Sequence, residues 1–358
     1  MRDGKHANGN QKRVFYVKYI PDPIFAEVLG ARGDVVLDKL ANTVTDAAAA
    51  PVLAEAQVYQ VGASRDELPV RFHVGTALLA RTPNLLIASS NGAGYDPIDV
   101  PACTAAGVIV VNQSGGNARS VAEHVIGMLL VLSKRISEAD HALRRGTVTD
   151  RNALMGREVF GRTIGIVGLG HTGGQVAEIS GALGLKVLAF DPYVDAATMT
   201  KRGAEKVALD DLLQRADFVS VNCPLTNETR GCLGAREFQL MRRGSIFISA
   251  ARGFIHDEKA LEGALESEHI AGAGLDVWAI EPPAAEHPLL RFDTVIASPH
   301  TAGVTHEARR NMGRIAAEQI LAALDGECPP RLINPEAWPK YSERFERAYG
   351  FRPDALTV

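Results

Sequence analysis

Short runs of apolar, mostly β-branched residues recur along this chain, and many of the stretches between them carry apolar residues at helical spacing. Alternation of this kind predicts parallel sheets with crossover helices, because parallel strands are buried on both faces and need long connections. In the first third of the chain we expect a helix over residues 22–32. The strands expected there span residues 14–20, 35–37, 58–61, 85–88 and 108–111.

A second series of apolar runs starts near residue 163, after a long helix with few charges that is expected over residues 120–133. A further helical stretch, 308–324, is expected to cross back to the first block. The pattern predicts an α/β fold of two Rossmann-like, doubly wound parallel-sheet domains. The second block is expected to have strands at 164–167, 187–190, 218–221, 245–249, 271–275 and 295–297, and helices at 208–216, 235–241 and 257–266.

A G-x-G-x-x-G turn, formed by Gly168, Gly170 and Gly173, stands between the first strand of this second block and a helix-compatible stretch. Gly168 permits the tight turn, Gly170 lets the backbone approach a pyrophosphate, and Gly173 lets the helix pack closely on the strand. Phosphate groups would then bind the unpaired N–H groups at the helix N-terminus. The motif therefore predicts a dinucleotide site.

Asp191 ends the next strand and lies 23 residues after Gly168 (191 − 168). A carboxylate at this place can accept hydrogen bonds from the ribose of adenosine, and it would repel a 2′-phosphate. The predicted cofactor is therefore NAD rather than NADP.

The position of this motif divides the chain. We predict an NAD-binding domain over residues 113–304 and a discontinuous substrate domain over residues 14–112 plus 305–358, with an active-site cleft between them. Residues 1–13 are polar and rich in glycine, asparagine and lysine, so they are expected to be disordered. The aromatic tail 335–358 is expected to pack on the surface or across a subunit interface.

Composition narrows the class of protein. The chain has 358 residues, of which 46% are hydrophobic and 22% charged, as in a globular protein of about two domains. A net charge of −4 and a pI near 6.2 give no basic surface for nucleic acid, and no apolar stretch approaches the ~18 residues of a membrane span.

No group of residues has metal-site spacing, so no metal is expected. Reduced thiols in a cytoplasm are expected for the widely spaced Cys103, Cys223, Cys232 and Cys328.

Three polar side chains follow strand ends of the second block: Arg252, Glu281 and His300. Taken singly, each is typical of an ordinary surface or turn residue. Together they would lie at the sheet edge where ligands bind in open parallel sheets. Arginine can bind a carboxylate, histidine can transfer a proton near neutral pH, and a carboxylate favours the protonated imidazole. Reduction of an α-keto acid beside NADH needs these groups.

The motifs of the chain resemble those of the D-isomer-specific 2-hydroxyacid dehydrogenases, from about residue 82 to residue 324. Beside the glycine turn, the resemblance rests on N-G-A-G-Y-D-P-I-D (91–99), G-G-N-A-R-S-V-A-E (115–123), C-P-L-T-N-E-T (223–229), A-R-G (251–253), G-L-D-V (274–277), E-P (281–282) and P-H-T-A-G (299–303).

The resemblance implies an NAD-dependent oxidoreductase that transfers a hydride between NAD(H) and a small D-2-hydroxy acid or 2-keto acid. It implies that Arg252, Glu281 and His300 are catalytic and that Asn91, Ala93 and Gly94 bind substrate together with Arg252. It also implies a homodimer formed through the NAD domain. The residues expected to line the cofactor are Gly168, Gly170, His171, Thr172, Gly173, Asp191, Cys223, Pro224, Thr229, Ala250, Ala251, Arg252, Asp276, His300, Ala302, Gly303 and Ser120.

Three positions depart from the family pattern. Ser249 stands where many members carry asparagine, and Val148 takes a place where many have a tryptophan near the dimer interface and active site. Around residues 60–64 the chain lacks the basic cluster expected for a phosphate-bearing substrate, with Arg65 as the only nearby cation in the sequence. A small unphosphorylated acid is therefore favoured over 3-phosphoglycerate.

The same motifs are compatible with two other functions. Phosphoglycerate dehydrogenase proper is one alternative. A non-catalytic, NAD-sensing protein similar to the corepressors of this superfamily is another, because those proteins keep the same three residues. Formate dehydrogenases share the fold but carry glutamine in the place of Glu281, which argues against that activity.

Overall fold

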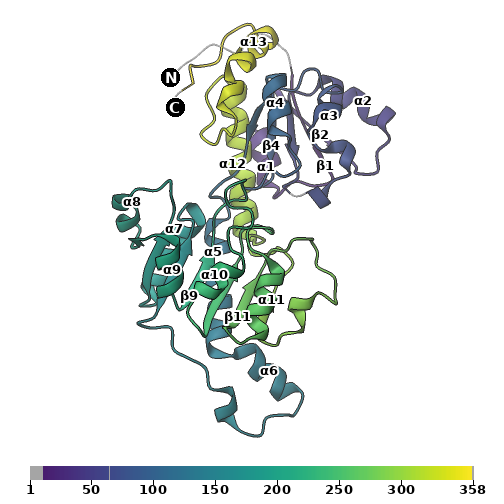
Figure 1. The fold of residues 1–358 in the computed structure, drawn as a ribbon. Coiled ribbons are helices and arrows are strands. Elements are labelled where there is room, and N and C mark those ends of the chain that lie inside the picture. The colour runs from purple at the N-terminus through teal and green to yellow at the C-terminus, as the bar shows by residue number, and fades with distance from the viewer. Residues whose placement is uncertain (1–10, 64, 357–358) are drawn as a thin grey trace. The chain divides into compact units, whose positions relative to one another are not determined.

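The computed structural model describes residues 11–63 and 65–356. The chain forms two compact units, here called unit 1 (Met1–Asn117 with His306–Val358) and unit 2 (Ala118–Thr305). Both are built on parallel sheets with helices on their faces, so the expected fold class is confirmed (Figure 1).

Unit 1 contains a five-stranded sheet in the order β2-β1-β3-β4-β5, in which every neighbouring pair is parallel. Its strands are β1 (Lys12–Val17), β2 (Val35–Leu40), β3 (Val58–Val61), β4 (Ile87–Ser90) and β5 (Ile109–Val111). Its helices are α1 (Ile24–Gly30), α2 (Asp46–Glu55), α3 (Thr76–Leu79), α4 (Val100–Ala106), α12 (His306–Leu324) and α13 (Trp338–Tyr349), with short 3₁₀ helices at Arg65–Glu67, Val70–Phe72 and Pro335–Ala337.

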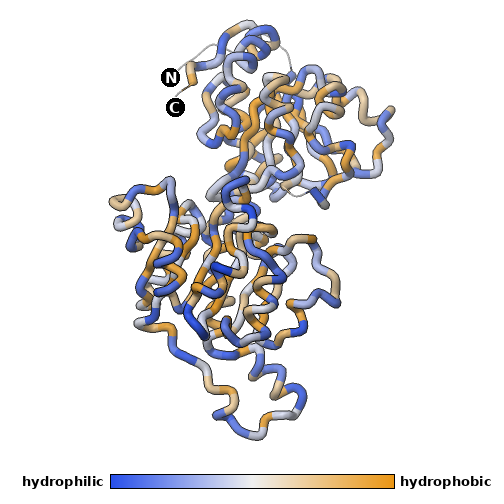
Figure 2. The backbone as a smooth tube through the Cα atoms, in the orientation of Figure 1, coloured by the Kyte–Doolittle hydropathy of each residue, from blue (hydrophilic) through white to orange (hydrophobic). Residues whose placement is uncertain are grey.

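Two apolar layers hold this sheet because successive strand residues point to opposite faces. Phe15 and Tyr59 stack with ring centroids 4.1 Å apart in the layer shared with α2 and α4. Their neighbours Val14 and Val58 pack into the opposite layer with α1, α12 and α13. In Figure 2 apolar stretches, coloured orange, run through the interior of both units.

Unit 2 contains a seven-stranded parallel sheet in the order β12-β11-β10-β9-β6-β7-β8. The chain order reverses at β6, which lies between β7 and β9. Its strands are β6 (Thr163–Val167), β7 (Lys186–Phe190), β8 (Glu205–Lys206), β9 (Phe218–Val221), β10 (Ser245–Ser249), β11 (Ile270–Leu275) and β12 (Val295–Ala297). Its helices are α5 (Ala118–Lys134), α6 (Ile136–Arg144), α7 (His171–Ala182), α8 (Ala196–Lys201), α9 (Leu209–Arg215), α10 (Ala235–Leu240) and α11 (Glu258–Glu266), with 3₁₀ helices at Arg151–Leu154 and Pro288–Arg291.

Helices cover both faces of this sheet. Side chains of α5 and α7 share one apolar cluster with the strands, and side chains of α9, α10 and α11 share the other. The strands β9 and β10 are buried along their whole length. The segment of α6 and residues 145–160 extends from the body of unit 2 (Figure 1), and α6 has no buried residue.

Several element boundaries differ from those expected. β1 begins at Lys12, so residues 12 and 13 belong to the sheet, while the rest of the expected disordered segment up to residue 10 lies outside the described residues. β1 ends at Val17 because Lys18 has a φ of 70°, outside strand geometry. β4 spans residues 87–90 rather than 85–88, because the apolar run starts before the hydrogen bonds between the strands do.

The aromatic tail packs on its own unit. Trp338, Tyr341 and Phe345 of α13 are buried in the same layer as α12. Within the part of the chain that the structure describes, no helix has the length and apolar composition needed to cross a membrane.

Candidate active site

The glycine turn joins β6 to α7 at the point where the strand order reverses. Gly168 has a φ of 90°, and a Cβ there would lie 2.7 Å from the backbone nitrogen of Cys223. A Cβ on Gly173 would overlap the carbonyl oxygen of Gly168. Both positions therefore require glycine, the first for the turn and the second for the close approach of helix and strand. A Cβ added at Gly170 would meet no described neighbour within 4 Å, which leaves room beside the start of α7.

Asp191 follows β7 directly, and two backbone amides hold its carboxylate. One oxygen accepts a hydrogen bond from the Leu169 N–H at 2.9 Å, and the other accepts from the Tyr193 N–H at 2.9 Å. The first bond fixes Asp191 against the glycine turn, where His171 and Thr172 begin α7. Each carboxylate oxygen has a second lone pair, so the group can still accept hydrogen bonds from ribose hydroxyls.

The loop after β9 approaches the same turn. Cys223 is the residue that a side chain at position 168 would strike. Thr229 closes this loop, because its hydroxyl donates to the Pro224 carbonyl at 2.6 Å and accepts from the Thr226 N–H at 2.8 Å. Burial raises the pKa of the Cys223 thiol to about 12, so this thiol is protonated and unreactive near neutral pH.

Arg252, Glu281 and His300 follow β10, β11 and β12, whose carboxyl ends share one sheet edge. Nδ1 of His300 lies 2.7 Å from Oε2 of Glu281. The other oxygen, Oε1, accepts a hydrogen bond from the Trp278 N–H at 3.1 Å. Nη1 of Arg252 donates to the Ala251 carbonyl at 2.7 Å, and the Arg252 charge acts on both members of the His300–Glu281 pair. The structure thus brings the three expected side chains together.

The pair shifts the proton affinity of both groups. The hydrogen bond to Glu281 raises the pKa of His300 above its usual value, against the opposing effects of burial and of the Arg252 charge. For Glu281, burial acts to raise the pKa, but the hydrogen bond and charge of His300 outweigh it, so the pKa lies below its usual value. The geometry therefore favours an imidazolium beside a carboxylate.

Asp276 organises the loop that carries His300. Its side chain is buried, and its carboxylate accepts hydrogen bonds from the Ser298 hydroxyl at 2.6 Å, the Thr301 N–H at 2.8 Å and the Ala302 N–H at 3.0 Å. The Asp276 carbonyl accepts from the His300 N–H at 2.8 Å, and His300 adopts a φ of 56°. The described hydrogen bonds of Asp276 thus go to the loop, although we expected this residue at the cofactor.

Two members of this network, His124 and Ser298, were not predicted from the sequence. Nε2 of His124 on α5 lies 2.9 Å from the hydroxyl of Ser298, which in turn bonds to Asp276. A histidine within a nearly uncharged, apolar helix was the available signal for it. Ser120, on the same helix, lies 2.8 Å from the Thr305 hydroxyl. Of the other residues expected near the cofactor, Ala250 and Ala251 follow β10, and Ala302 and Gly303 follow His300.

The substrate loop expected in unit 1 follows β4 and is held from within its own unit. Nε2 of Gln60 donates to Oδ1 of Asn91 at 2.6 Å, which leaves the Asn91 NH₂ group as a donor. Nδ2 of Asn112 donates to the Ala93 carbonyl at 2.8 Å. Within the described residues, the backbone N–H groups of Ala93 and Gly94 have no hydrogen-bond acceptor. Two adjacent free N–H groups of this kind can bind an anion.

Two arginines of unit 1, Arg65 and Arg309, lie near the loop that follows β4. Nε of Arg65 donates to the Asp96 carbonyl at 3.0 Å. Arg309, at the start of α12, was not predicted from the sequence, and its guanidinium lies 5.8 Å from the centre of the Tyr19 ring. The Tyr19 hydroxyl donates to Glu67 at 2.6 Å, and Glu67 accepts from the Ala63 N–H at 2.8 Å beside the loop. No local motif marks Arg309, because 309 and 19 are distant in sequence.

Residues 126–302 match the model of the D-isomer specific 2-hydroxyacid dehydrogenase NAD binding domain. The D-3-phosphoglycerate dehydrogenase of Mycobacterium leprae is 42% identical over 261 residues, which are 73% of this chain and 49% of that protein. The glyoxylate reductase of Korarchaeum cryptofilum is 37% identical over 257 residues, 71% of this chain and 77% of that protein. The chain belongs to the D-isomer-specific 2-hydroxyacid dehydrogenase family.

The fold comparison agrees with this family. The crystal structure of D-lactate dehydrogenase from Aquifex aeolicus, complexed with NAD and lactic acid, superposes with a TM-score of 0.74 at 25% identity and covers 87% of this chain and 96% of that chain. The present chain spans about half the length of the phosphoglycerate dehydrogenases that it matches. The comparison thus covers both units, and unit 2 is a domain of the family's NAD-binding type.

Two residues that depart from the family pattern, Ser249 and Val148, lie in unit 2. Ser249 ends β10, and its buried hydroxyl has no hydrogen-bond partner among the described residues. Val148 lies in the segment after α6 and is exposed. Within the described chain, no group of three or more histidine, cysteine, aspartate or glutamate side chains could hold a metal ion.

Proposed function

We propose that this protein is an NAD-dependent oxidoreductase that transfers a hydride between NAD(H) and a small D-2-hydroxy acid or 2-keto acid. The observation that carries the proposal is the 2.7 Å contact between His300 and Glu281. It lies at the same sheet edge as a glycine turn that fits a dinucleotide. Family membership and the NAD-binding type of unit 2 support it.

Each of the three side chains has a distinct role in this proposal. The Arg252 guanidinium binds the substrate carboxylate, since a planar pair of N–H donors matches two carboxylate oxygens. The His300 imidazolium donates a proton to the carbonyl oxygen during reduction and accepts it again during oxidation. Glu281 stabilises the protonated imidazole and fixes the ring through Nδ1, which leaves Nε2 for the substrate.

In this proposal, unit 2 holds the cofactor through the glycine turn and Asp191. The first turn of α7, after Gly168, binds the pyrophosphate, and Asp191 accepts hydrogen bonds from the ribose. The Asp191 carboxylate disfavours a 2′-phosphate, so we propose NAD rather than NADP. When bound, NADH supplies the hydride. The remaining proposed cofactor contacts come from Ser120, His171, Thr172, Cys223, Pro224, Thr229, Ala250, Ala251, Asp276, Ala302 and Gly303.

For unit 1 we propose that Asn91 and the free amides of Ala93 and Gly94 bind the substrate carboxylate. A phosphorylated substrate, as in phosphoglycerate dehydrogenase, is the second candidate. It is favoured by the 42% identity to a phosphoglycerate dehydrogenase and by Arg309, a cation additional to Arg65. The small unphosphorylated acid remains our first choice because Arg65 already donates to a backbone carbonyl.

We also propose a homodimer formed through unit 2. The segment from α6 to residue 160 exposes several large apolar side chains, and exposed apolar patches usually mark interfaces. These side chains are Ile136, Leu143, Val148, Met155 and Phe160. A cytoplasmic location is proposed because the four cysteines are free thiols.

The proposal is tested by following NADH oxidation with pyruvate, glyoxylate, hydroxypyruvate, oxaloacetate, bulkier 2-keto acids and 3-phosphohydroxypyruvate, each repeated with NADPH. Turnover of at least one unphosphorylated acid, with NADH preferred, is expected. Preference for 3-phosphohydroxypyruvate would select the second candidate. Absence of turnover with every acid, in a protein that still binds NADH, would contradict the catalytic proposal and favour a non-catalytic, NAD-sensing protein.

A further inference from the structure

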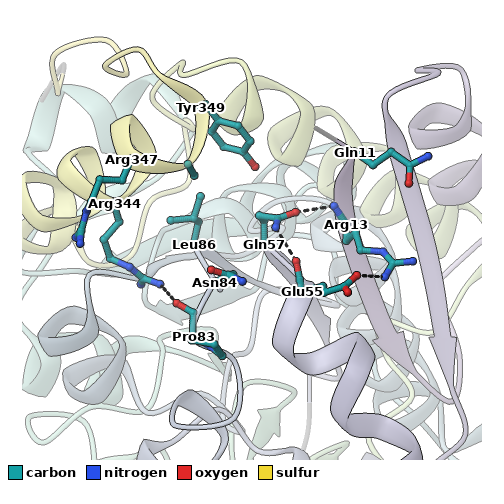
Figure 3. A pocket seen from close by; sticks show the side chains of 11 residues that line it. Gln11, Arg13, Glu55, Gln57, Pro83, Asn84, Leu86, Arg344, Arg347 and Tyr349 are labelled. Atoms are coloured by element: carbon teal, nitrogen blue, oxygen red, sulfur yellow. Dashed lines mark hydrogen bonds and ion pairs between the residues drawn. The ribbon is translucent and has the colours of Figure 1, made fainter. Parts of the chain in front are cut away.

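Unit 1 contains a cavity of about 840 Å³ at the end of its sheet opposite to the substrate loop (Figure 3). It is formed at the amino ends of β1, β3 and β4 and by the last turns of α13. Leu86 in its wall precedes β4, whereas Asn91 follows it. Five residues of extended chain separate the two by roughly 16 Å. The cavity is therefore a separate place from the proposed substrate site.

Three arginines line this cavity, and their charges are unequally compensated. Arg13 on β1 contacts Glu55 at 2.5 Å and Asp38 at 3.3 Å. Arg344 on α13 donates to neutral backbone carbonyls, including that of Pro83 at 2.7 Å (Figure 3). Nε of Arg347 donates to the Glu343 carbonyl of its own helix at 3.3 Å. Neither Arg344 nor Arg347 has a carboxylate partner among the described residues.

The surroundings of Arg344 favour a bound anion. Burial and the charge of Arg347 hold the pKa of Arg344 below its usual value, so an anion between the two would relieve their mutual repulsion. Tyr349 lines the cavity as well, and its buried hydroxyl has no hydrogen-bond partner in the described part of the chain.

We propose that this cavity binds a small polyanionic molecule carrying phosphate or carboxylate groups, held by Arg344 and Arg347. The volume of the cavity lies in the range of small-molecule sites. It is larger than the volume that a single phosphate ion requires. Nucleic acid is disfavoured because the chain as a whole carries a net charge of −4. The proposal is independent of the reaction in unit 2.

Isothermal titration of the full chain with citrate, and separately with inorganic pyrophosphate, tests the proposal and distinguishes the two chemistries. At least one probe is expected to bind saturably. Arg347→Gln should weaken that binding about tenfold or more, because it removes a charge-assisted hydrogen bond to the anion. Arg347 is exposed and, among the described residues, hydrogen-bonds only within its own helix, so the variant should fold, and circular dichroism checks this.

Three further variants test where the anion binds. Lys39→Gln removes the same charge from an exposed position of unit 1 outside the cavity and should leave the affinity unchanged. Arg252→Gln should also leave it unchanged, which separates this cavity from the proposed catalytic arginine. Arg347→Lys should restore part of the affinity. Absence of saturable binding for both probes, or equal affinity in the parent and Arg347→Gln, would overturn the proposal.

Discussion

At the scale of single residues, the charge on His300 depends on one neighbouring carboxylate. Glu281 raises the pKa of His300 by accepting its hydrogen bond, against burial. In the direction of keto-acid reduction the protonated imidazole is the active form, so activity is present below that raised pKa and falls as the pH rises through it. Glu281→Gln should lower the pKa of His300. The alkaline limb of kcat/KM against pH should therefore move to a lower pH in this variant.

Removal of the His300 imidazole should lower kcat. His300→Gln should lower kcat on the order of 10² to 10⁴-fold while NADH binding survives. His287→Gln is a matched control, because His287 also lies beside a glutamate of unit 2, with 3.4 Å between its Nε2 and Glu258. That control should retain its kcat. A His300→Gln enzyme with the parent's turnover, or an unmoved pH profile in Glu281→Gln, would contradict the proposed proton transfer.

The sequence predicted that Arg252, Glu281 and His300 lie together, because each of them follows a strand end. This prediction needed only the spacing of residues along the chain. The sequence could not predict the support beneath them. Asp276 binds the 298–302 loop, and His124 reaches Ser298 from a helix 174 residues earlier in the chain. The same limit applies to Arg309, whose neighbour Tyr19 is close only after folding. Contacts of this kind arise from tertiary packing, and no local pattern marks them.

At the scale of elements, the glycine turn was predictable in detail, whereas helix α2 was not. The turn has a fixed spacing of glycines. At Gly168 and Gly173 a Cβ atom would collide with neighbouring backbone, so glycine is required at both positions. The α2 sequence D-A-A-A-A-P-V-L-A-E has no clear apolar period and contains Pro51, so its apolar pattern does not predict a helix, although its alanines favour one and Ala49 and Leu53 are buried. β1 starts two residues and ends three residues before the expected bounds, and β4 lies two residues after them, because inter-strand hydrogen bonds, rather than apolar runs, define a strand.

Two alanine substitutions in α7 should have opposite effects. Gly173→Ala places a methyl group against the Gly168 carbonyl, so it should lower the free energy of unfolding by about 1–3 kcal/mol and weaken NADH binding. Gly181→Ala in the same helix meets no described atom within 4 Å and should raise that free energy by up to about 1 kcal/mol. Urea denaturation and fluorescence titration of NADH measure both effects. A Gly173→Ala protein as stable as the parent would show that helix and strand do not need this close approach.

At the scale of the whole molecule, the parallel sheets followed from the alternation of apolar runs and helical stretches, and the comparisons confirm the family. The packing of the aromatic tail could not be predicted from this alternation. Its aromatic residues indicated burial, but only the structure shows that Trp338, Tyr341 and Phe345 pack with α12 on unit 1. The proposed dimer is a similar case, because exposure of an apolar side chain becomes known only once the rest of the chain is in place.

The dimer proposal makes a prediction for the segment from α6 to residue 160. Leu143 and Met155 are 72% and 69% exposed, and in a dimer they would be buried by the partner. Leu143→Asp combined with Met155→Asp should convert a dimer into a monomer in sedimentation velocity, because burying a carboxylate without a partner is strongly unfavourable. Val70→Asp is the matched control, since Val70 is 80% exposed in unit 1, and this variant should remain dimeric. A monomeric parent, or a double variant that stays dimeric, would remove this segment from the proposed interface.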